Sequence, residues 1–184
     1  MSIRTLISTL RADLLRHWDI DKSFMGNIRW MVFAQGVWAT VVYRFGQWVY
    51  EGHHPLIGQP SRFFYVGLNK AVEITTGIQL PASAKIGQGF YIGHFGTIIL
   101  HTHTVMGVGC SIGQGVTIGT KGHGSKGVPV IGDNVAIHAG AKVLGPIRVG
   151  NNVAIGANAV VLNDVPSDSI AVGVPARVLP KKTD

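Results

Sequence analysis

Three kinds of residue in the second half of the chain have types and spacings that suit chemistry. Single histidines stand in glycine-containing segments, and His94 lies in a Gly-His-Phe-Gly segment. An imidazole with its usual pKa of about 6.5 is mostly neutral at pH 7 and can accept a proton from a hydroxyl group. Two small residues, Ala139 and Ala157, lie 18 positions apart, and Arg177 in the C-terminal tail could pair with phosphate.

An aliphatic residue that returns every six positions predicts the element that holds these residues. A period of six fits neither an α-helix, with about 3.6 residues per turn, nor a single β-strand, with about two. It is typical of a parallel β-helix, in which three six-residue units close one coil and residues about 18 apart stack. A glycine-rich β-sandwich would instead alternate with a period of two. The repeating positions are Leu80, Ile86, Ile92, Ile98, Met106, Ile112, Ile118, Ile131, Ile137, Val143, Val149, Ile155 and Val161.

The six-residue frame breaks at two places. Two extra residues enter after Ile98, and we place them around 101–104. Seven extra residues enter after Ile118, which predicts an inserted loop at 119–130 that contains His123. Because insertions into a solenoid project from one face, often the functional one, we expect this loop to cover a site.

Residues 1–77 have helical periodicity. Three helices are expected there, at about 2–18, 26–50 and 62–74. The first coil of a β-helix has an open apolar end and unpaired backbone groups, and a helical layer would cover both. The predicted organisation is an α-helical cap or oligomerisation region at 1–77 and a β-helix domain at 78–184, with a tail from residue 164.

The stretch at 28–50 is rich in aromatic residues and has no charged residue between Arg29 and Arg44. Its apolar part is shorter than the ~20 residues that span a bilayer. Two interpretations stay open. The stretch packs against helices or a neighbouring subunit, or it makes peripheral contact with a membrane surface, where tryptophan and tyrosine are enriched.

The net charge of +7 is spread along the chain. Residues 1–77 carry 8 Lys and Arg against 5 Asp and Glu, and residues 78–184 carry 8 against 4. Without a nucleic-acid-binding motif, this distribution favours a phosphate-bearing ligand or a membrane surface over nucleic acid. The single cysteine, Cys110, and an N-terminus without a signal-peptide pattern lead us to expect a cytoplasmic protein.

Four segments carry a resemblance to a known family. They are Ile-Gly-His-Phe-Gly at 92–96, Gly-Val-Thr-Ile-Gly at 115–119, Gly-Ala-Lys-Val-Leu-Gly at 140–145 and Gly-Val-Pro-Ala-Arg at 173–177. With them the chain resembles the hexapeptide-repeat acyltransferases, in the serine O-acetyltransferase branch and closest to the polysaccharide-biosynthesis O-acetyltransferases. The resemblance covers nearly the whole chain. It implies a left-handed β-helix, a homotrimer with sites between subunits, and acetyl-CoA as the acyl donor.

The resemblance also implies roles for individual residues. His94 matches the general base that takes the proton from the acceptor hydroxyl. Gln79, Phe95 and His123 are expected to orient this base or the acceptor. The residues expected to bind acetyl-CoA are Gly119, Thr120, Ala139, Ala157 and Arg177.

The chain departs from the serine acetyltransferase pattern at three positions. Gln79 stands where that family has an aspartate, Gly93 where it has an acidic residue, and Val128 where it has a second histidine. Because these family residues recognise the amino acid, the expected acceptor is a sugar or a lipid-linked glycan intermediate of exopolysaccharide or capsule type. The reaction would then take place in the cytoplasm or at the inner face of the membrane. Serine O-acetylation and a non-catalytic trimeric scaffold remain the alternatives.

A β-helix can also hold zinc between subunits, as the γ-type carbonic anhydrases do with histidines that include a pair five positions apart. No histidine lies five positions from His123 or His138 in this sequence. We therefore expect no metal site, and we assign His101 and His103 to loop or subunit contacts.

Overall fold

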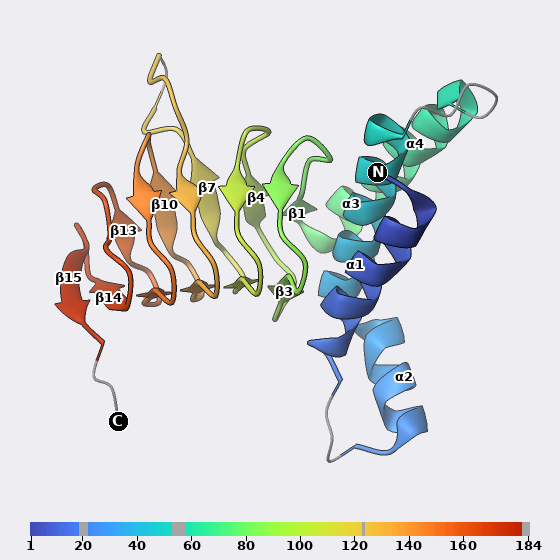
Figure 1. The fold of residues 1–184 in the computed structure, drawn as a ribbon, viewed down its shortest axis with the longest axis horizontal. Helices are drawn as coiled ribbons and strands as arrows, with labels where there is room; N and C mark the ends of the chain where they lie inside the picture. The colour runs from blue at the N-terminus through green and yellow to red at the C-terminus, as the bar shows by residue number, and fades with distance from the viewer. Residues whose placement is uncertain (19–21, 53–57, 123, 182–184) are drawn as a thin grey trace.

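The computed structural model describes residues 1–18, 22–52, 58–122 and 124–181. A layer of helices stands at one end of a solenoid of short strands, and the last strands lie at the other end (Figure 1). The helices are α1 (Ile3–Leu15), α2 (Phe24–Phe33), α3 (Gln35–Glu51) and α4 (Gly58–Thr76). The strands are β1 (Ile78–Gln79), β2 (Lys85–Ile86), β3 (Tyr91–Ile92), β4 (Ile98–Leu100), β5 (Val105–Met106), β6 (Ser111–Ile112), β7 (Thr117–Gly119), β8 (Val130–Ile131), β9 (Ala136–Ile137), β10 (Lys142–Leu144), β11 (Arg148–Val149), β12 (Ala154–Ile155), β13 (Val160–Val161), β14 (Ser169–Val172) and β15 (Arg177–Pro180).

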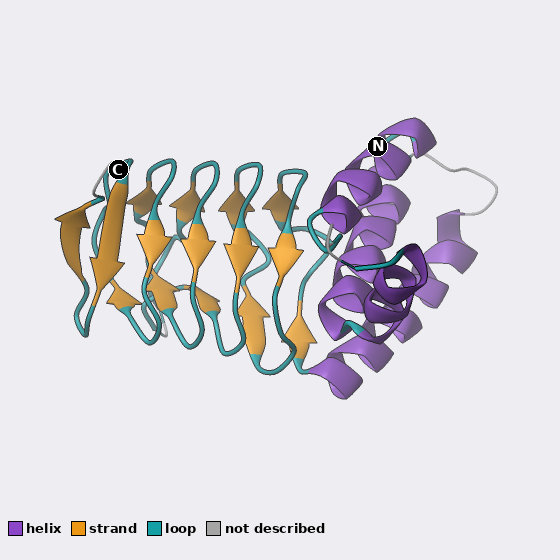
Figure 2. Ribbon diagram, turned by 90° about the horizontal axis from the view of Figure 1, so that it is seen from below, coloured by secondary structure: helices purple, strands orange, loops and turns teal. Residues whose placement is uncertain are grey.

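The strands form three sheets, which are the three flat sides of the solenoid (Figure 2). Sheet A has the order β1-β4-β7-β10-β13, sheet B the order β11-β8-β5-β2, and sheet C the order β15-β14-β12-β9-β6-β3. Neighbouring strands are parallel except for β14 and β15, which are antiparallel. Through the repeat the chain passes through sheets A, B and C in turn and so advances by one coil. The predicted fold class, N-terminal helices followed by a hexapeptide-repeat β-helix, is confirmed.

The spacing of paired residues shows how long each coil is. In the regular coils the partners are 18 residues apart, as for Ala136 and Ala154. Partners that enclose the 119–130 loop are 25 apart, as for Thr117 and Lys142. This is 18 plus the seven inserted residues that the sequence predicts. The first coil is two residues longer than the regular ones, with partners 20 apart at Ile78 and Ile98, Ile86 and Met106, and Ile92 and Ile112.

The two-residue insertion lies in a different turn from the one predicted. Leu100 and Met106 are neighbouring positions of the frame, so the segment at 101–104 has regular length and its assignment as an insertion is wrong. The extra residues lie instead between Ile92 and Leu100. The sequence is ambiguous here because Ile98 and Leu100 are both aliphatic and both buried, at 0% and 2% exposure.

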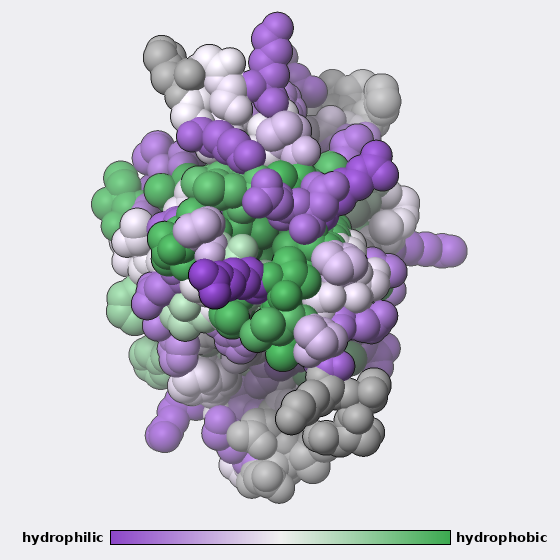
Figure 3. All heavy atoms as spheres, turned by 90° about the vertical axis from the view of Figure 1, so that its left-hand side faces the viewer, coloured by the Kyte–Doolittle hydropathy of each residue, from purple (hydrophilic) through white to green (hydrophobic). Residues whose placement is uncertain are grey.

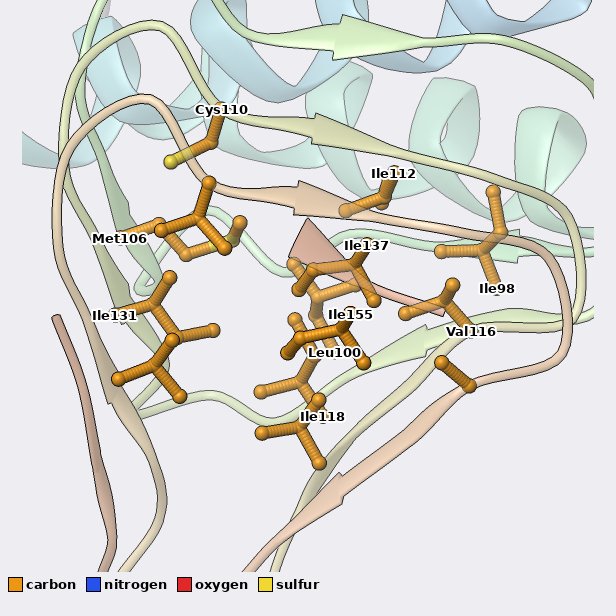
Figure 4. Close-up of a cluster of buried hydrophobic side chains, with 14 of the residues drawn as sticks. Ile98, Leu100, Met106, Cys110, Ile112, Val116, Ile118, Ile131, Ile137 and Ile155 are labelled. Carbon is orange, nitrogen blue, oxygen red and sulfur yellow. The ribbon is translucent and has the colours of Figure 1, made fainter. Parts of the chain in front are cut away.

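Aliphatic side chains fill the solenoid and point toward its axis (Figure 4). The thirteen residues of the predicted repeat are at most 5% exposed. The backbones of successive coils approach closely at the corners. A Cβ atom on Gly87 would lie 2.6 Å from the carbonyl carbon of Gly107 in the next coil, so only glycine fits there.

The helical layer departs from the prediction in its middle. The hydroxyl group of Ser2 caps α1, and α4 covers the third predicted helix. The single helix predicted at 26–50 is wrong, because Ala34 has an extended backbone (φ −76°, ψ 102°) that separates α2 from α3. Beyond this break α3 lies on the end of the solenoid. A Cβ atom on Gly36 would come within 2.5 Å of the carbonyl oxygen of Ile92.

A buried ion pair joins the helices to the first coil. Arg44 of α3 and Asp13 of α1 are 2% and 1% exposed, and Nε of the arginine lies 2.7 Å from the carboxylate. The Arg44 guanidinium also donates to the carbonyl oxygens of Ile86 (2.7 Å) and Gly87 (2.6 Å). Asp13 accepts a hydrogen bond from the backbone N–H of Phe90 at 2.8 Å. These side chains bond to backbone groups that have no neighbouring coil on this side.

Tyr43 gives a second contact of the same kind. Its hydroxyl group donates to the carbonyl oxygen of Ala84 (2.8 Å) and accepts from the N–H of Ile86 (3.2 Å), as a neighbouring strand would. Gln47 also donates to the carbonyl of Ala84. Burial raises the pKa of the Tyr43 hydroxyl, so the side chain stays neutral and keeps its proton for this bond.

Replacing Arg44 by methionine is expected to lower the free energy of unfolding by about 3–5 kcal/mol, because it leaves the Asp13 carboxylate buried without its charge partner. Urea denaturation at a fixed protein concentration measures the change. The matched control is Arg4→Met on the exposed side of α1, for which a change within about 0.5 kcal/mol is expected. Equal effects of the two substitutions would contradict the role given to the buried pair.

Candidate functional site

The turn from β3 to β4 contains the two extra residues of the first coil. The backbone hydrogen bonds between coils place Gly93 and Gly96 level with the neighbours at 113–114 in the next coil. His94 and Phe95, which lie between these glycines, have no counterpart in the next coil. Both side chains are exposed, Phe95 at 58%. The insertion therefore projects one imidazole and one aromatic ring from an otherwise regular corner.

The backbone of this turn is strained, and the end of α4 packs against it. Thr97 has φ of 37°, in a region that β-branched residues rarely adopt, and Gly96 before it has φ of 108°. The N–H of Gly96 donates to the carbonyl oxygen of Thr76 at the end of α4, at 3.0 Å. A Cβ atom on Gly77 would lie 3.0 Å from the nitrogen of Thr97. The end of α4 therefore supports the turn that carries His94.

A row of stacked residues continues from this turn along the corner between sheets C and A. The N–H of Gly140, which follows Ala139, donates to the carbonyl oxygen of Gln114 at 2.7 Å. The N–H of Asn158, which follows Ala157, donates to the carbonyl oxygen of Ala139 at 2.8 Å. Because coils are about 4.8 Å apart, the row from Gly96 to Ala157 spans roughly 14 Å. We name Gly96, Gln114, Ala139 and Ala157 the C–A edge. Ala139 is partly exposed and Ala157 is exposed.

The C-terminal tail lies just beyond Ala157. The N–H of Val160 donates to the carbonyl of Gly173, and the N–H of Ala176 donates back to the carbonyl of Val160. Arg177 follows at the start of β15 and is exposed. Figure 3 faces this end of the solenoid, where apolar side chains gather among polar ones. The exposed apolar residues of β14, β15 and the turn between them are Val172, Val174, Val178 and Leu179.

A groove with a volume of about 350 Å³ lies on the outer face of sheet A. It brings together Gln79, Gly119 and Thr120, three of the residues that the sequence proposes for the site. His101 lines the same groove, although the sequence assigned it to loop or subunit contacts. Its Nδ1 accepts a hydrogen bond from the N–H of His103 at 3.1 Å, which leaves Nε2 to carry the proton in the neutral ring.

The inserted loop at 119–130 stands above the corner between sheets A and B (Figure 1). Its described residues pack against the next coil. The side chain of Lys121 lies where a Cβ on Gly145 would fall, and Gly127 approaches Pro146. His123 lies outside the described residues.

The C–A edge and the groove lie on opposite margins of sheet A. Gln114 and Gly119 belong to one coil and are five residues apart, which corresponds to about 16 Å of extended chain. A single chain therefore does not bring Ala139 and Ala157 together with Gly119 and Thr120.

Two polar residues belong to this region, Gln114 in the C–A edge and Lys142 beside it. Gln114 lies between the His94 turn and Ala139, and the sequence reasoning missed it because the 119–130 loop lengthens the spacing to 25. Lys142 donates from Nζ to the carbonyl of Gly115 (2.5 Å) and to the hydroxyl of Thr117 (3.1 Å). It places a cation on sheet A next to the edge.

Within the described parts of the chain no hydrogen bond joins the side chain of His94 to Gln79 or to another residue. The same parts contain no cluster of three metal-ligating side chains. Cys110 is buried and its Sγ lies 3.2 Å from the carbonyl oxygen of Gly132. Burial raises the pKa of this thiol, so it is a poor nucleophile. His94 is the exposed imidazole at the head of the C–A edge.

The chain is similar to known transferases in sequence and in fold. The family "Bacterial transferase hexapeptide (six repeats)" matches residues 129–163. The chain is 36% identical over 175 residues to a serine acetyltransferase of Synechococcus elongatus, which covers 95% of this chain and 69% of that protein. A solved serine acetyltransferase of Neisseria gonorrhoeae in complex with serine superimposes with a TM-score of 0.79 at 28% identity, over 97% of this chain and 70% of that one. A serine acetyltransferase in complex with CoA gives a TM-score of 0.70 at 28% identity, over 96% and 71%.

These relatives refine the resemblance read from the sequence. They support a hexapeptide-repeat transferase similar to the serine acetyltransferases. They give no support to the narrower expectation of closeness to the polysaccharide O-acetyltransferases. That expectation depends on Gln79, Gly93 and Val128 and on the His-Phe-Gly segment at 94–96, whereas the likeness to serine acetyltransferases extends over nearly the whole chain.

Replacing Thr97 by glycine is expected to raise the free energy of unfolding by roughly 0.5–1 kcal/mol. Glycine relieves about 1–2 kcal/mol of backbone strain and loses part of that gain through its greater unfolded-state entropy. Thermal or urea unfolding measures the change. The control is Thr102→Gly in a turn without positive φ, where destabilisation is expected. If both substitutions destabilise equally, the His94 turn is not strained.

Proposed function

Because the chain belongs to the serine acetyltransferase family, we propose that it transfers an acetyl group from acetyl-CoA to an acceptor hydroxyl, with His94 as the general base. The family consists of acyltransferases, and this chain is one of them. The observation that carries the proposal is the two-residue insertion that projects His94 at the head of the C–A edge. A donor lying along the edge and an acceptor arriving from solvent can both reach this imidazole.

In the proposed reaction the neutral imidazole of His94 accepts the proton of the acceptor hydroxyl while the oxygen attacks the thioester carbonyl carbon. The C–S bond then breaks and the acetyl group stays on the acceptor oxygen. The imidazolium returns its proton to the thiolate of CoA. Atoms and charges balance without a covalent enzyme intermediate, so the chain has to supply only the base and the orientation of the two substrates.

The C–A edge suits the extended pantetheine arm of the donor. The small side chains of Ala139 and Ala157 leave room for the arm to approach the backbone. The row covers roughly 14 Å from the His94 turn. Arg177 begins β15, the last strand of sheet C beyond β14, where its guanidinium could pair with the nucleotide phosphates. A family member solved in complex with CoA supports this assignment of the donor.

We propose that a homotrimer completes the site. Gly119 and Thr120 line the groove, on the margin of sheet A away from Ala139 and Ala157. If a neighbouring subunit lays its C–A edge against the groove, both sets of residues reach one acetyl-CoA molecule. The same contact would bring Gln79 and His101 of one subunit near the acceptor.

L-serine is the acceptor that the comparisons favour. The relatives named above are serine acetyltransferases, and one of them is solved with serine bound. L-serine is therefore the first acceptor to test.

A sugar hydroxyl is the second candidate, and one observation favours it. Within the described residues, neither the His94 turn nor the groove presents a carboxylate that could pair with an α-ammonium group. The groove instead offers the neutral side chains of Gln79, Thr102 and Thr120, which can bond to hydroxyl groups. A capsule-type or lipid-linked glycan would present the same hydroxyl chemistry.

Replacing His94 by alanine is expected to lower kcat/KM by about 10²-fold or more, because the substitution removes the base. The assay is acetyl-CoA-dependent thiol release with L-serine and with a panel of sugars and nucleotide sugars. Phe95→Ala, which keeps the base and removes its neighbour, is the matched control and should retain more activity. Size-exclusion chromatography and circular dichroism check that both variants fold.

The outcomes separate the candidates. Activity on L-serine alone would identify the chain as a serine O-acetyltransferase, and activity on a sugar alone would favour the second candidate. If His94→Ala keeps full activity, His94 is not the base. If no acceptor works and acetyl-CoA does not bind, the non-catalytic trimeric scaffold is the better description.

Replacing Ala157 by leucine is expected to raise the KM for acetyl-CoA about tenfold or more and to leave the KM for the acceptor unchanged. The longer side chain would occupy the path of the pantetheine arm, whereas the acceptor lies at the other end of the edge. Ala154→Leu, in the same coil but on the outer face of β12, is the matched control. If the two substitutions shift the KM for acetyl-CoA equally, the arm does not follow the C–A edge.

A further inference from the structure

Helix α2 exposes apolar side chains on nearly every side. Within its ten residues only Asn27 is buried. Phe24, Met25 and Phe33 are exposed at 66%, 70% and 72%. The other large apolar residues of α2 with exposed side chains are Ile28, Trp30 and Val32. A helix of this kind lacks its partner in the isolated chain.

Helix α1 extends the same surface. Ile3, Ile7 and Leu15 are exposed at 54%, 60% and 57% on one stripe of α1. A groove of about 390 Å³ joins the two helices, and Trp18 and Met31 are among the residues that line it. We name the exposed apolar residues of 3–18 and 24–33 the α1–α2 surface.

The structure narrows the stretch that the sequence offered for membrane contact, 28–50. Its second part, α3, is packed against the solenoid, with Val37, Tyr43 and Val49 at most 7% exposed. Trp38, Val41 and Tyr50 of α3 are also exposed, at 40%, 37% and 48%, but the most exposed apolar side chains of the stretch lie in α2. No described helix is long and apolar enough to cross a bilayer.

The described charged residues of α1 and α2 that are exposed are all positive. Arg4, Arg11 and Arg29 have no ion-pair partner within the described residues. Lys22 lies over the ring of Trp30, 4.9 Å from its centroid. Asp13, the acidic residue of α1, is buried with Arg44 and does not offset these charges.

We propose that the α1–α2 surface docks on an anionic lipid bilayer, with the helices lying in the headgroup region. Exposed tryptophan and phenylalanine side chains suit the interface between headgroups and acyl chains. The unpaired arginines suit lipid phosphates and a negatively charged leaflet. A second copy of the same surface is a poorer partner, because a two-fold contact would set these arginines against each other.

Vesicle cosedimentation tests the proposal with the full chain. The probes are phosphatidylcholine vesicles with and without phosphatidylglycerol, at low salt and at about 0.5 M NaCl, where charge attraction is screened. Binding is expected only to the anionic vesicles, and salt should weaken it. Met25→Ser with Phe33→Ser should reduce the affinity at least about tenfold, because two large apolar side chains are lost from the buried area.

The matched control removes equally exposed apolar side chains elsewhere. Phe63 and Ile74 of α4 are exposed at 78% and 76%, so Phe63→Ser with Ile74→Ser should leave vesicle binding unchanged. Acetyl transfer in solution should be the same for both double variants, because none of the four residues lies at the site. Absence of binding, or equal loss in both variants, would overturn the proposal. It would also be overturned if light scattering showed that the α2 variant loses a subunit contact.

Discussion

The hydrogen-bonded ion pair between Arg44 and Asp13 is the contact on which the rest of the structure depends. A β-helix has backbone groups at its first coil that no further coil can pair, and an open apolar end. Arg44, Asp13 and Tyr43 bond to those backbone groups from the helical layer. Such a buried charge is tolerated because its donors find acceptors. These bonds fix the position of the first coil against the helical layer.

The same junction connects the fold to the candidate chemistry. The last turn of α4 holds the Gly96 backbone through the carbonyl of Thr76, and the turn around Thr97 is strained. His94 and Phe95 project from that turn, at the first layer of the C–A edge. Regular coils then repeat the corner at fixed spacing, so the coil geometry and the support from α4 together set the position of His94 relative to the edge. The repeat by itself specifies only the solenoid, and the insertion adds the exposed side chains of the candidate site.

The sequence predicts the positions that follow the six-residue repeat. It does not predict the position of an insertion where two residues can both continue the repeat. Six-residue spacing was enough to predict the buried positions and the 119–130 loop. It could not place the shorter insertion, because Ile98 and Leu100 are both aliphatic and either could keep the frame. The break occurs at Ala34, which is neither proline nor glycine, and it depends on how α3 meets the solenoid through Gly36. Gln114 was missed for a simpler reason, since the loop hides its alignment with Ala139. The groove that joins Gln79 to Thr120 is a product of coiling, which no local pattern reports.

A crystal structure of the protein with CoA bound is the most direct test of the proposed site. The thiol end of CoA is expected to lie beside the His94 imidazole. The pantetheine arm is expected to follow Gln114, Ala139 and Ala157 toward Arg177, with the 119–130 loop of a neighbouring subunit against it. If CoA binds away from this edge, or with its thiol end far from His94, the proposed site is wrong.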